Sequence, residues 1–328
     1  MADAEYLNPF VLPVDTRVAE RHGAVDLYLP DRAPGPCPAV VFVHGGPVPA
    51  DLRPTPREWP VYQGYGSAVA DSGAVGVTVD HRLHDLAGYP LAAADVAAAV
   101  QMVREDRRVD AGRVALWFFS GGGLLLADWL RAPPGWLRCV AATYPVLAPL
   151  PGWEVDPRFR PVQTIAAAGD LPIVLTRAGR ERPQVAATVE EFTRAAGRCG
   201  ARLEIIDVPG GQHGFDMLDH TDESRQAVRR ALDAVLAPLP GWEVDPRFRP
   251  VQAVTSAGDL PIVLTRVGRE RPQIAATVDE FTSAAGRCGA RLEIIDVPGG
   301  QHGFDMLDHT DESRQAVRRA LNAVLTIV

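Results

Sequence analysis

The stretch RVALWFFSGGGLLLADWLR, residues 113–131, decides the fold because it places a serine between an apolar strand and a helix. Residues 113–120 form a continuous apolar run, which is typical of a strand covered on both faces of a parallel sheet. Ser120 fits a nucleophile elbow, in which a sharp turn exposes the hydroxyl and the following helix N-terminus stabilises negative charge. The usual pattern is G-x-S-x-G; Gly122 matches it, and Phe118 stands in place of the first glycine. The alternative is a serine that only caps the helix.

Apolar runs and helical patterns alternate along the chain on both sides of this stretch. The alternation predicts an α/β fold with a mostly parallel sheet and helices on both faces, whose reactive groups gather at the carboxyl ends of the strands. The expected strands cover residues 24–29, 39–46, 74–83, 113–120, 137–146, 172–177 and 202–209, and the expected helices cover 61–73, 91–108, 122–131, 184–200 and 222–236.

The C-terminal part of the chain is a tandem repeat. Residues 147–235 and 236–324 align without a gap, with nine mismatches in 89 positions and therefore 80 identities. Two copies are too few for a solenoid, which generally needs three or more stacked units. We predict a catalytic domain at residues 1–236. Residues 237–328 would then be a duplicate of its C-terminal β-α-β-α unit that either extends the sheet or is exchanged with a neighbouring chain.

Composition narrows the class of protein. The net charge of −8 argues against nucleic acid or an anionic membrane as a partner, and the absence of lysine excludes lysine-based covalent chemistry. We find no signal-peptide pattern, and no apolar run approaches the ~20 residues of a membrane span. Four cysteines without a CxxC spacing favour a reduced, cytoplasmic protein, and we expect no cofactor.

A second strand end carries the sequence HGGP, residues 44–47. Backbone N–H groups of such a turn can form an oxyanion hole with the N–H of Gly121, which follows the serine. Pro47 has no N–H, so the donor must be Gly45 or Gly46. The alternative is an ordinary glycine turn in which His44 bonds only to backbone.

The sequence GGQHGFDMLDH occurs twice, at residues 210–220 and 299–309, so a catalytic base could be His213 or His302. A base needs an acid to orient it, and the loop after the preceding strand offers Glu181 or its repeat counterpart Glu270. The rival acids are Asp170 and Asp207, with the counterparts Asp259 and Asp296.

The same loop could also suggest a metal site, because His213, Asp216, Asp219 and His220 lie close together in the sequence. No established ligand spacing is present, so we expect no metal there and interpret the acidic residues as the solvated start of a helix.

Together, the stretches AVVFVHGGP, ALWFFSGGG, LTRAGRERP and GGQHGF resemble the α/β-hydrolase superfamily, most closely its dienelactone-hydrolase-like and carboxylesterase branches. The resemblance covers residues 1–236, and residues 237–325 match its C-terminal part again. It implies an α/β-hydrolase fold, and dienelactone hydrolases use cysteine as the nucleophile, so the serine found here favours an esterase. The roles implied are Ser120 as nucleophile, Glu181 as acid, His213 as base, and Gly45, Gly46 and Gly121 as the oxyanion hole.

The nucleophile occurs once, so each chain can hold at most one complete triad. The first copy reaches the site through a short connection after Tyr144, whereas the second would loop out 89 residues at a cost of about 1–2 kcal/mol. We therefore expect one active site, completed by His213, and a second copy that has only a structural role.

The sequence predicts a serine hydrolase that cleaves small carboxylic esters through an acyl-enzyme intermediate. One alternative is a peptidase or other acyl hydrolase with the same triad, because HGGP also resembles prolyl-oligopeptidase-type catalytic domains. Another is a non-catalytic binding module of the same fold. The expected partners are a small ester and, through an exchanged repeat, a second copy of the chain in a homodimer.

Overall fold

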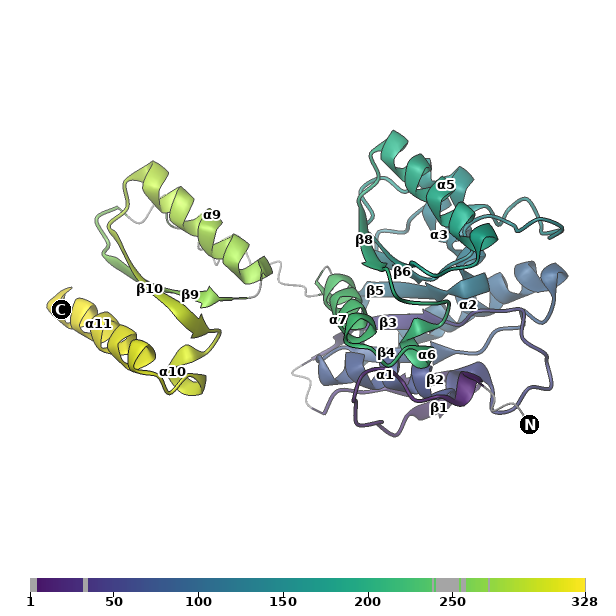
Figure 1. Cartoon of the computed structure of the whole chain (residues 1–328), viewed down its shortest axis with the longest axis horizontal. Coiled ribbons are helices and arrows are strands. Elements are labelled where there is room, and N and C mark those ends of the chain that lie inside the picture. Colours follow the sequence, from purple (N-terminus) through teal and green to yellow (C-terminus); the bar gives the residue numbers. More distant parts are fainter. Residues whose placement is uncertain are drawn as a thin grey trace. The chain divides into compact units, whose positions relative to one another are not determined.

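The structure, a computed structural model, describes residues 5–31, 35–237, 239, 254, 258–270 and 272–327. The chain divides into two units, Met1–Gly241 and Trp242–Val328, which we call the main unit and the duplicate unit (Figure 1). The boundary predicted from the repeat lies a few residues earlier, at 236/237.

An eight-stranded sheet forms the centre of the main unit, in the order β1-β2-β4-β3-β5-β6-β7-β8. β2 is antiparallel to β1 and to β4, and the other neighbours are parallel. The strands are β1 (Glu20–His22), β2 (Val25–Tyr28), β3 (Cys37–Val43), β4 (Val75–Val79), β5 (Val109–Phe119), β6 (Leu137–Thr143), β7 (Ile173–Ala178) and β8 (Leu203–Val208). The helices are α1 (Pro60–Asp71), α2 (Tyr89–Glu105), α3 (Leu126–Arg131), α4 (Pro161–Thr164), α5 (Pro183–Cys199), α6 (Phe215–Leu218) and α7 (Asp222–Leu236). Short 3-10 turns are η1 (Glu5–Leu7), η2 (Pro56–Glu58), η3 (Leu86–Gly88), η4 (Ser120–Leu125) and η5 (Ile165–Ala167).

Both faces of the sheet are covered, which explains why β5 is apolar at every position near its carboxyl end. Leu116 and Phe118 join a core cluster with α2, α3 and α5, whereas Trp117 and Phe119 join a second cluster with α1 and α7. Successive side chains of a strand point to opposite faces, so each cluster receives alternate residues. The predicted α/β class, with helices on both faces of a mostly parallel sheet, is confirmed.

One long apolar helix of the main unit is a core helix. Among the described residues, only Leu86–Glu105 is long and apolar enough to cross a membrane, although we had expected no such stretch. Its residues Val96, Val100 and Val103 are buried in the main unit against the sheet, which is the pattern of an internal helix.

The main difference from the predicted elements lies directly after Ser120. A helix was expected from residue 122, but η4 intervenes and α3 begins only at Leu126. Glycine loses more conformational freedom in a helix than any other residue, so three consecutive glycines disfavour an α-helical start. The edge strand β1, made of polar residues, was not predicted.

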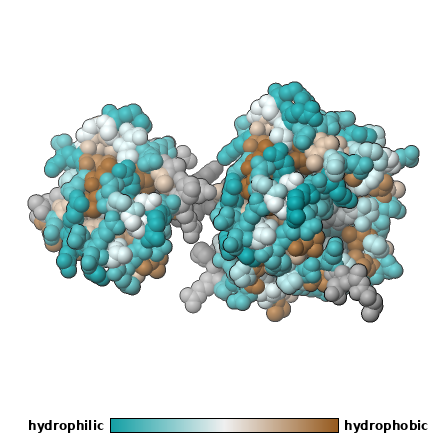
Figure 2. Space-filling view, in the orientation of Figure 1, coloured by the Kyte–Doolittle hydropathy of each residue, from teal (hydrophilic) through white to brown (hydrophobic). Residues whose placement is uncertain are grey.

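The duplicate unit contains β9 (Ile262–Arg269), α9 (Pro272–Cys288), β10 (Leu292–Gln301), α10 (Phe304–Leu307) and α11 (Asp311–Ile327). β9 and β10 are parallel, and Ile262 pairs with Leu292 as Ile173 pairs with Leu203 in the first copy. The main sheet ends at β8, and β9 and β10 form a sheet of their own. Among the described strands none extends the main sheet beyond β8, so the extended sheet, one of the two expected arrangements, is not seen in the residues that the structure describes. Apolar surface is visible on the duplicate unit as brown patches in Figure 2.

Candidate active site

Ser120 sits in a strained turn at the carboxyl end of β5. Its φ is 48°, in the left-handed region that disfavours residues with a Cβ at a cost of about 1–2 kcal/mol. Phe118, which departs from the usual pattern, is fully buried in the cluster formed with α2 and α3. The elbow therefore forms with phenylalanine at that position.

The glycines around the serine are required by close backbone contact. A Cβ on Gly121 would lie 1.9 Å from the carbonyl oxygen of Gly46, and one on Gly45 would lie 2.8 Å from the Cβ of Ser120. The HGGP turn is thus packed directly against the serine turn, as an oxyanion hole requires. The N–H of Gly45 donates to the hydroxyl of Tyr62 at 3.4 Å, so Gly46 is the better donor candidate from this turn.

Three side chains form a continuous hydrogen-bonded chain. Ser120 Oγ lies 2.7 Å from His213 Nε2, and His213 Nδ1 lies 2.5 Å from Glu181 Oε2. The geometry fits a histidine that donates from Nδ1 to the carboxylate and accepts the serine proton at Nε2. The Glu181 side chain is 4% exposed. Burial raises the pKa of Glu181, but its hydrogen bonds and charge interactions with His213 and Arg182 together outweigh burial and hold the pKa below its usual value.

A buried carboxylate network supports the histidine loop. Asp216 is fully buried and accepts hydrogen bonds from the hydroxyls of Tyr65 at 3.0 Å and Tyr144 at 2.8 Å. Tyr144 has a φ of 38°, and its ring centroid lies 4.8 Å from that of His213. These residues fix the loop on which the base sits. The sequence analysis missed both tyrosines; the aromatic residue directly after the β6 run is the signal that could have drawn attention to Tyr144.

The rival readings of this region find no support. Asp170 is exposed, and Asp207 pairs with Arg177 at 2.7 Å. Asp219 accepts hydrogen bonds from Gln212. In the part of the chain that the structure describes, no group of three or more His, Cys, Asp or Glu side chains is arranged to hold a metal ion.

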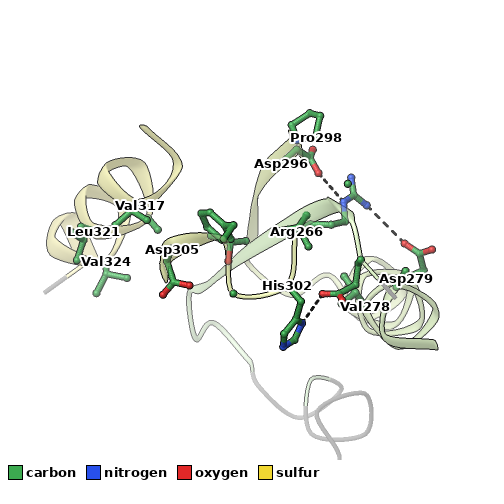
Figure 3. Close-up of a pocket in the computed structure, with 18 residues that line it drawn as sticks. Arg266, Val278, Asp279, Asp296, Pro298, His302, Asp305, Val317, Leu321 and Val324 are labelled. Atoms are coloured by element: carbon green, nitrogen blue, oxygen red, sulfur yellow. Dashed lines mark hydrogen bonds and ion pairs between the residues drawn. The ribbon is translucent and has the colours of Figure 1, made fainter. Parts of the chain in front are cut away.

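The second copy keeps the same acid–base pair. His302 Nδ1 lies 2.9 Å from Glu270 Oε2, and both residues line a cavity in the duplicate unit (Figure 3). The His302 side chain is 66% exposed, compared with 26% for His213. The duplicate unit thus keeps the hydrogen-bonded histidine–glutamate pair of the first copy.

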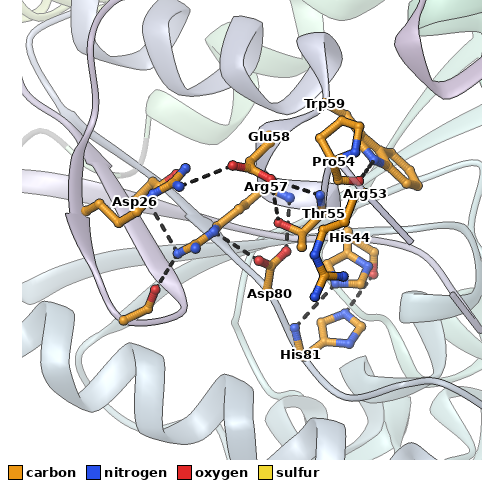
Figure 4. A network of polar contacts seen from close by, with 12 residues as sticks. Asp26, His44, Arg53, Pro54, Thr55, Arg57, Glu58, Trp59, Asp80 and His81 are labelled. Carbon is orange, nitrogen blue, oxygen red and sulfur yellow. Dashed lines mark hydrogen bonds and ion pairs between the residues drawn. The ribbon is translucent and has the colours of Figure 1, made fainter. Parts of the chain in front are cut away.

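His44, the first residue of the HGGP turn, packs against His81 and has a structural role in the site. Its ring stacks on that of His81, with the centroids 3.6 Å apart, and the N–H of His81 donates to His44 Nε2 (Figure 4). Burial lowers the pKa of His81 to about 4 and that of His44 well below its usual value, so both rings are neutral near pH 7. Nearby, Arg57 forms an ion pair with Asp80 at 2.9 Å. These contacts hold the strand ends that carry the HGGP turn.

The sheet order, the serine elbow and the chain order serine–acid–histidine define the α/β-hydrolase fold. The family model described as BD-FAE, an esterase family of the α/β-hydrolase type, matches residues 25–128.

Solved structures agree on the fold. Esterase 2 of Thermogutta terrifontis, phosphoramylated by tabun, is similar with a TM-score of 0.54 and 20% identity over 71% of this chain and 94% of that one. DphMB1 is similar with a TM-score of 0.53 and 22% identity over 70% and 89%. Porphyromonas gingivalis dipeptidyl peptidase 4 has a TM-score of 0.52 and 15% identity over 66% of this chain and 33% of that one. No curated protein sequence matches the chain.

Proposed function

We propose that the protein is a serine hydrolase that cleaves small carboxylic esters. The observation that carries the proposal is the continuous hydrogen-bonded chain from Ser120 through His213 to Glu181, with the serine held in a left-handed turn. An isolated serine cap would need neither a base at 2.7 Å from its hydroxyl nor a strained backbone.

The reaction proceeds through an acyl-enzyme. Ser120 Oγ attacks the ester carbonyl while its proton passes to His213 Nε2, and the negative oxygen of the tetrahedral intermediate is held by the N–H groups of Gly121 and of Gly46 or Gly45. The carbon–oxygen bond to the alcohol breaks, and the alcohol leaves with the proton from His213. Water then gives a proton to the same nitrogen and attacks the acyl carbon. The bond between that carbon and Ser120 Oγ breaks, the proton returns from His213 to Oγ, and the acid is released.

Glu181 has a positioning role. Its ionised carboxylate holds the proton on Nδ1, which leaves Nε2 free to accept the serine proton, and it stabilises the imidazolium that forms during each proton transfer. The lowered pKa of Glu181 keeps this carboxylate ionised at neutral pH.

The first test is hydrolysis of p-nitrophenyl acetate by the wild type and by Ser120→Ala. We expect the variant to lose at least about 1,000-fold in kcat, because the oxyanion hole and binding alone retain only a small part of triad catalysis. Ser72→Ala is the matched control, since Ser72 is exposed and its hydroxyl only caps α1. Undiminished turnover by Ser120→Ala would refute the triad.

The two alternative functions are separated by two further measurements. A fluorophosphonate probe that labels Ser120 but not the Ser120→Ala variant supports an acyl hydrolase over a binding module. Comparison of p-nitrophenyl acetate with p-nitroacetanilide then separates esterase from amidase activity, because the same acyl group is transferred from a poorer leaving group in the anilide.

A further inference from the structure

The duplicate unit leaves uncovered the apolar side chains that hold the first copy in the main unit. Leu232 and Val235 of α7 are 7% and 0% exposed, and they pack in one cluster with the sheet. Their counterparts Leu321 and Val324 in α11 are 56% and 49% exposed. The same sequence is therefore buried in one copy and faces solvent in the other.

These side chains line a cavity rather than a flat surface. The cavity has a volume of about 960 Å³, and Val317, Leu321 and Val324 lie along one side of it, with Asp305 and His302 beside them (Figure 3). In the first copy the counterparts of His302 and Asp305 contact Tyr144, and the counterparts of the three apolar residues belong to the same core cluster as Tyr144 and Ala141 of β6.

The strand pairing of β9 points to the same surface as the cavity does. In the main unit β7 lies between β6 and β8, and the N–H of Tyr144 donates to the carbonyl of Thr176. Among the described strands, β9, the counterpart of β7, pairs with β10 alone. The uncovered edge of β9 is therefore the edge that in the first copy receives β6.

A polar contact adds specificity to this match. Asp216 is buried between the hydroxyls of Tyr65 and Tyr144, whereas its counterpart Asp305 is exposed. All nine mismatches between the copies lie outside residues 195–232, so Asp305 and the apolar residues of α11 up to Leu321 retain the side chains of the first copy.

We propose that the duplicate unit exchanges with the first copy on the β6 edge of its own chain, so that His302 and Glu270 complete a second triad with Ser120. The surface that covers the cavity is the scaffold formed by residues 5–146, the surface that already holds the first copy. In the exchanged state His302 Nε2 accepts the proton of Ser120 Oγ, Glu270 orients His302, and the first copy is looped out. This proposal rests on the proposed function.

The population of the exchanged state follows from the chain connection. Both states dock one copy and leave one undocked, and 80 of the 89 aligned positions are identical, so most of the docking contacts are the same in the two states. The exchanged state carries an additional 89 residues between the scaffold and the docked copy, and loop closure makes it about five- to thirtyfold less populated. The same chain is favoured over a second one because the tether gives an effective concentration in the millimolar range.

The test is the kcat of the full-length chain for p-nitrophenyl acetate in His213→Ala and in His213→Ala/His302→Ala. We expect His213→Ala to retain roughly 3–15% of the wild-type rate, set by the exchanged population, and the double variant to lose at least about 1,000-fold. Equal rates for the single and double variants overturn the proposal. That outcome differs from failure of the proposed function, in which Ser120→Ala would be as active as the wild type.

A substitution that blocks docking of the duplicate unit, made in the His213→Ala background, tests whether the residual rate comes from exchange or from another base that assists Ser120. Leu321→Asp places a charge at a position that docking buries, so we expect the residual rate to fall at least tenfold. Gln315→Asp is the matched control, because Gln315 and its counterpart Gln226 are both exposed, and it should leave the residual rate within twofold. Equal rates for these two variants overturn the proposal. A residual specific activity that rises with protein concentration also overturns it, because it would place the duplicate unit on a second chain.

Discussion

Replacement of Asp216 by asparagine tests how the buried carboxylate controls stability. Burial raises the pKa of Asp216 from 3.8 to about 6, although the hydrogen bonds from Tyr144 and Tyr65 oppose the rise. Folding therefore favours the protonated form of this group. Its contribution to stability is fully present below about pH 3.8 and is lost as the pH rises through about 6.

The size of the effect follows from the shift. A rise of about two pKa units corresponds to roughly 3 kcal/mol, since each unit is worth 1.36 kcal/mol. Asparagine has the same shape as the protonated side chain and does not titrate. The free energy of unfolding of the wild type, measured relative to that of Asp216→Asn, should thus fall by roughly 3 kcal/mol between pH 3.5 and pH 7.5.

The assay is urea unfolding at both pH values, followed by tryptophan fluorescence. Only the difference between the two proteins is interpreted, because the other carboxylates titrate equally in both. Asp305→Asn is the matched control: it makes the same substitution at the exposed counterpart, so its change with pH should be smaller than that of Asp216→Asn. A difference between wild type and Asp216→Asn that does not change with pH would refute the reasoning, as would an equal change in Asp305→Asn.

Three further outcomes are expected. Glu181→Gln should lower kcat by about 10³–10⁴-fold with little change in the circular dichroism spectrum, because the amide no longer fixes the tautomer of the catalytic histidine. Gly121→Ala should lower kcat about 100-fold or more and also lower the melting temperature, since its Cβ would lie 1.9 Å from the carbonyl oxygen of Gly46. Leu232→Asp in the Leu321→Asp background, where the duplicate unit cannot replace the first copy, should destabilise the main unit by at least about 3 kcal/mol in urea unfolding, whereas Leu321→Asp alone should stay within about 0.5 kcal/mol, because the two leucines are 7% and 56% exposed.

The sheet could be predicted in detail because each strand of the main unit carries its own local signal. The continuous apolar run at 113–120 predicts a strand covered on both faces, and the structure buries Trp117 and Phe118 on opposite faces. The turn after Ser120 was predicted less well. Three glycines disfavour an α-helical start there, and contact with the HGGP loop, far away in the sequence, also holds this turn, so the expected early helix is wrong.

The acid was harder to choose than the nucleophile or the base. Glu181, Asp170 and Asp207 all lie near strands of the repeat, and the sequence favoured Glu181 only from its place after β7. The structure separates them because Asp207 is held by Arg177 and Asp170 faces solvent, while Glu181 is buried beside His213. Which carboxylate is buried depends on tertiary packing, which spacing in the sequence does not encode.

The repeat shows most clearly that the same sequence can be buried in one place and exposed in another. Residues 195–232 and 284–321 are identical, yet Leu232 is buried and Leu321 is exposed. The difference lies in the surface that covers each copy, since the first copy packs against β6 and its neighbours in the main unit. If the two copies compete for Ser120 as proposed above, the short connection after Tyr144 favours the first copy.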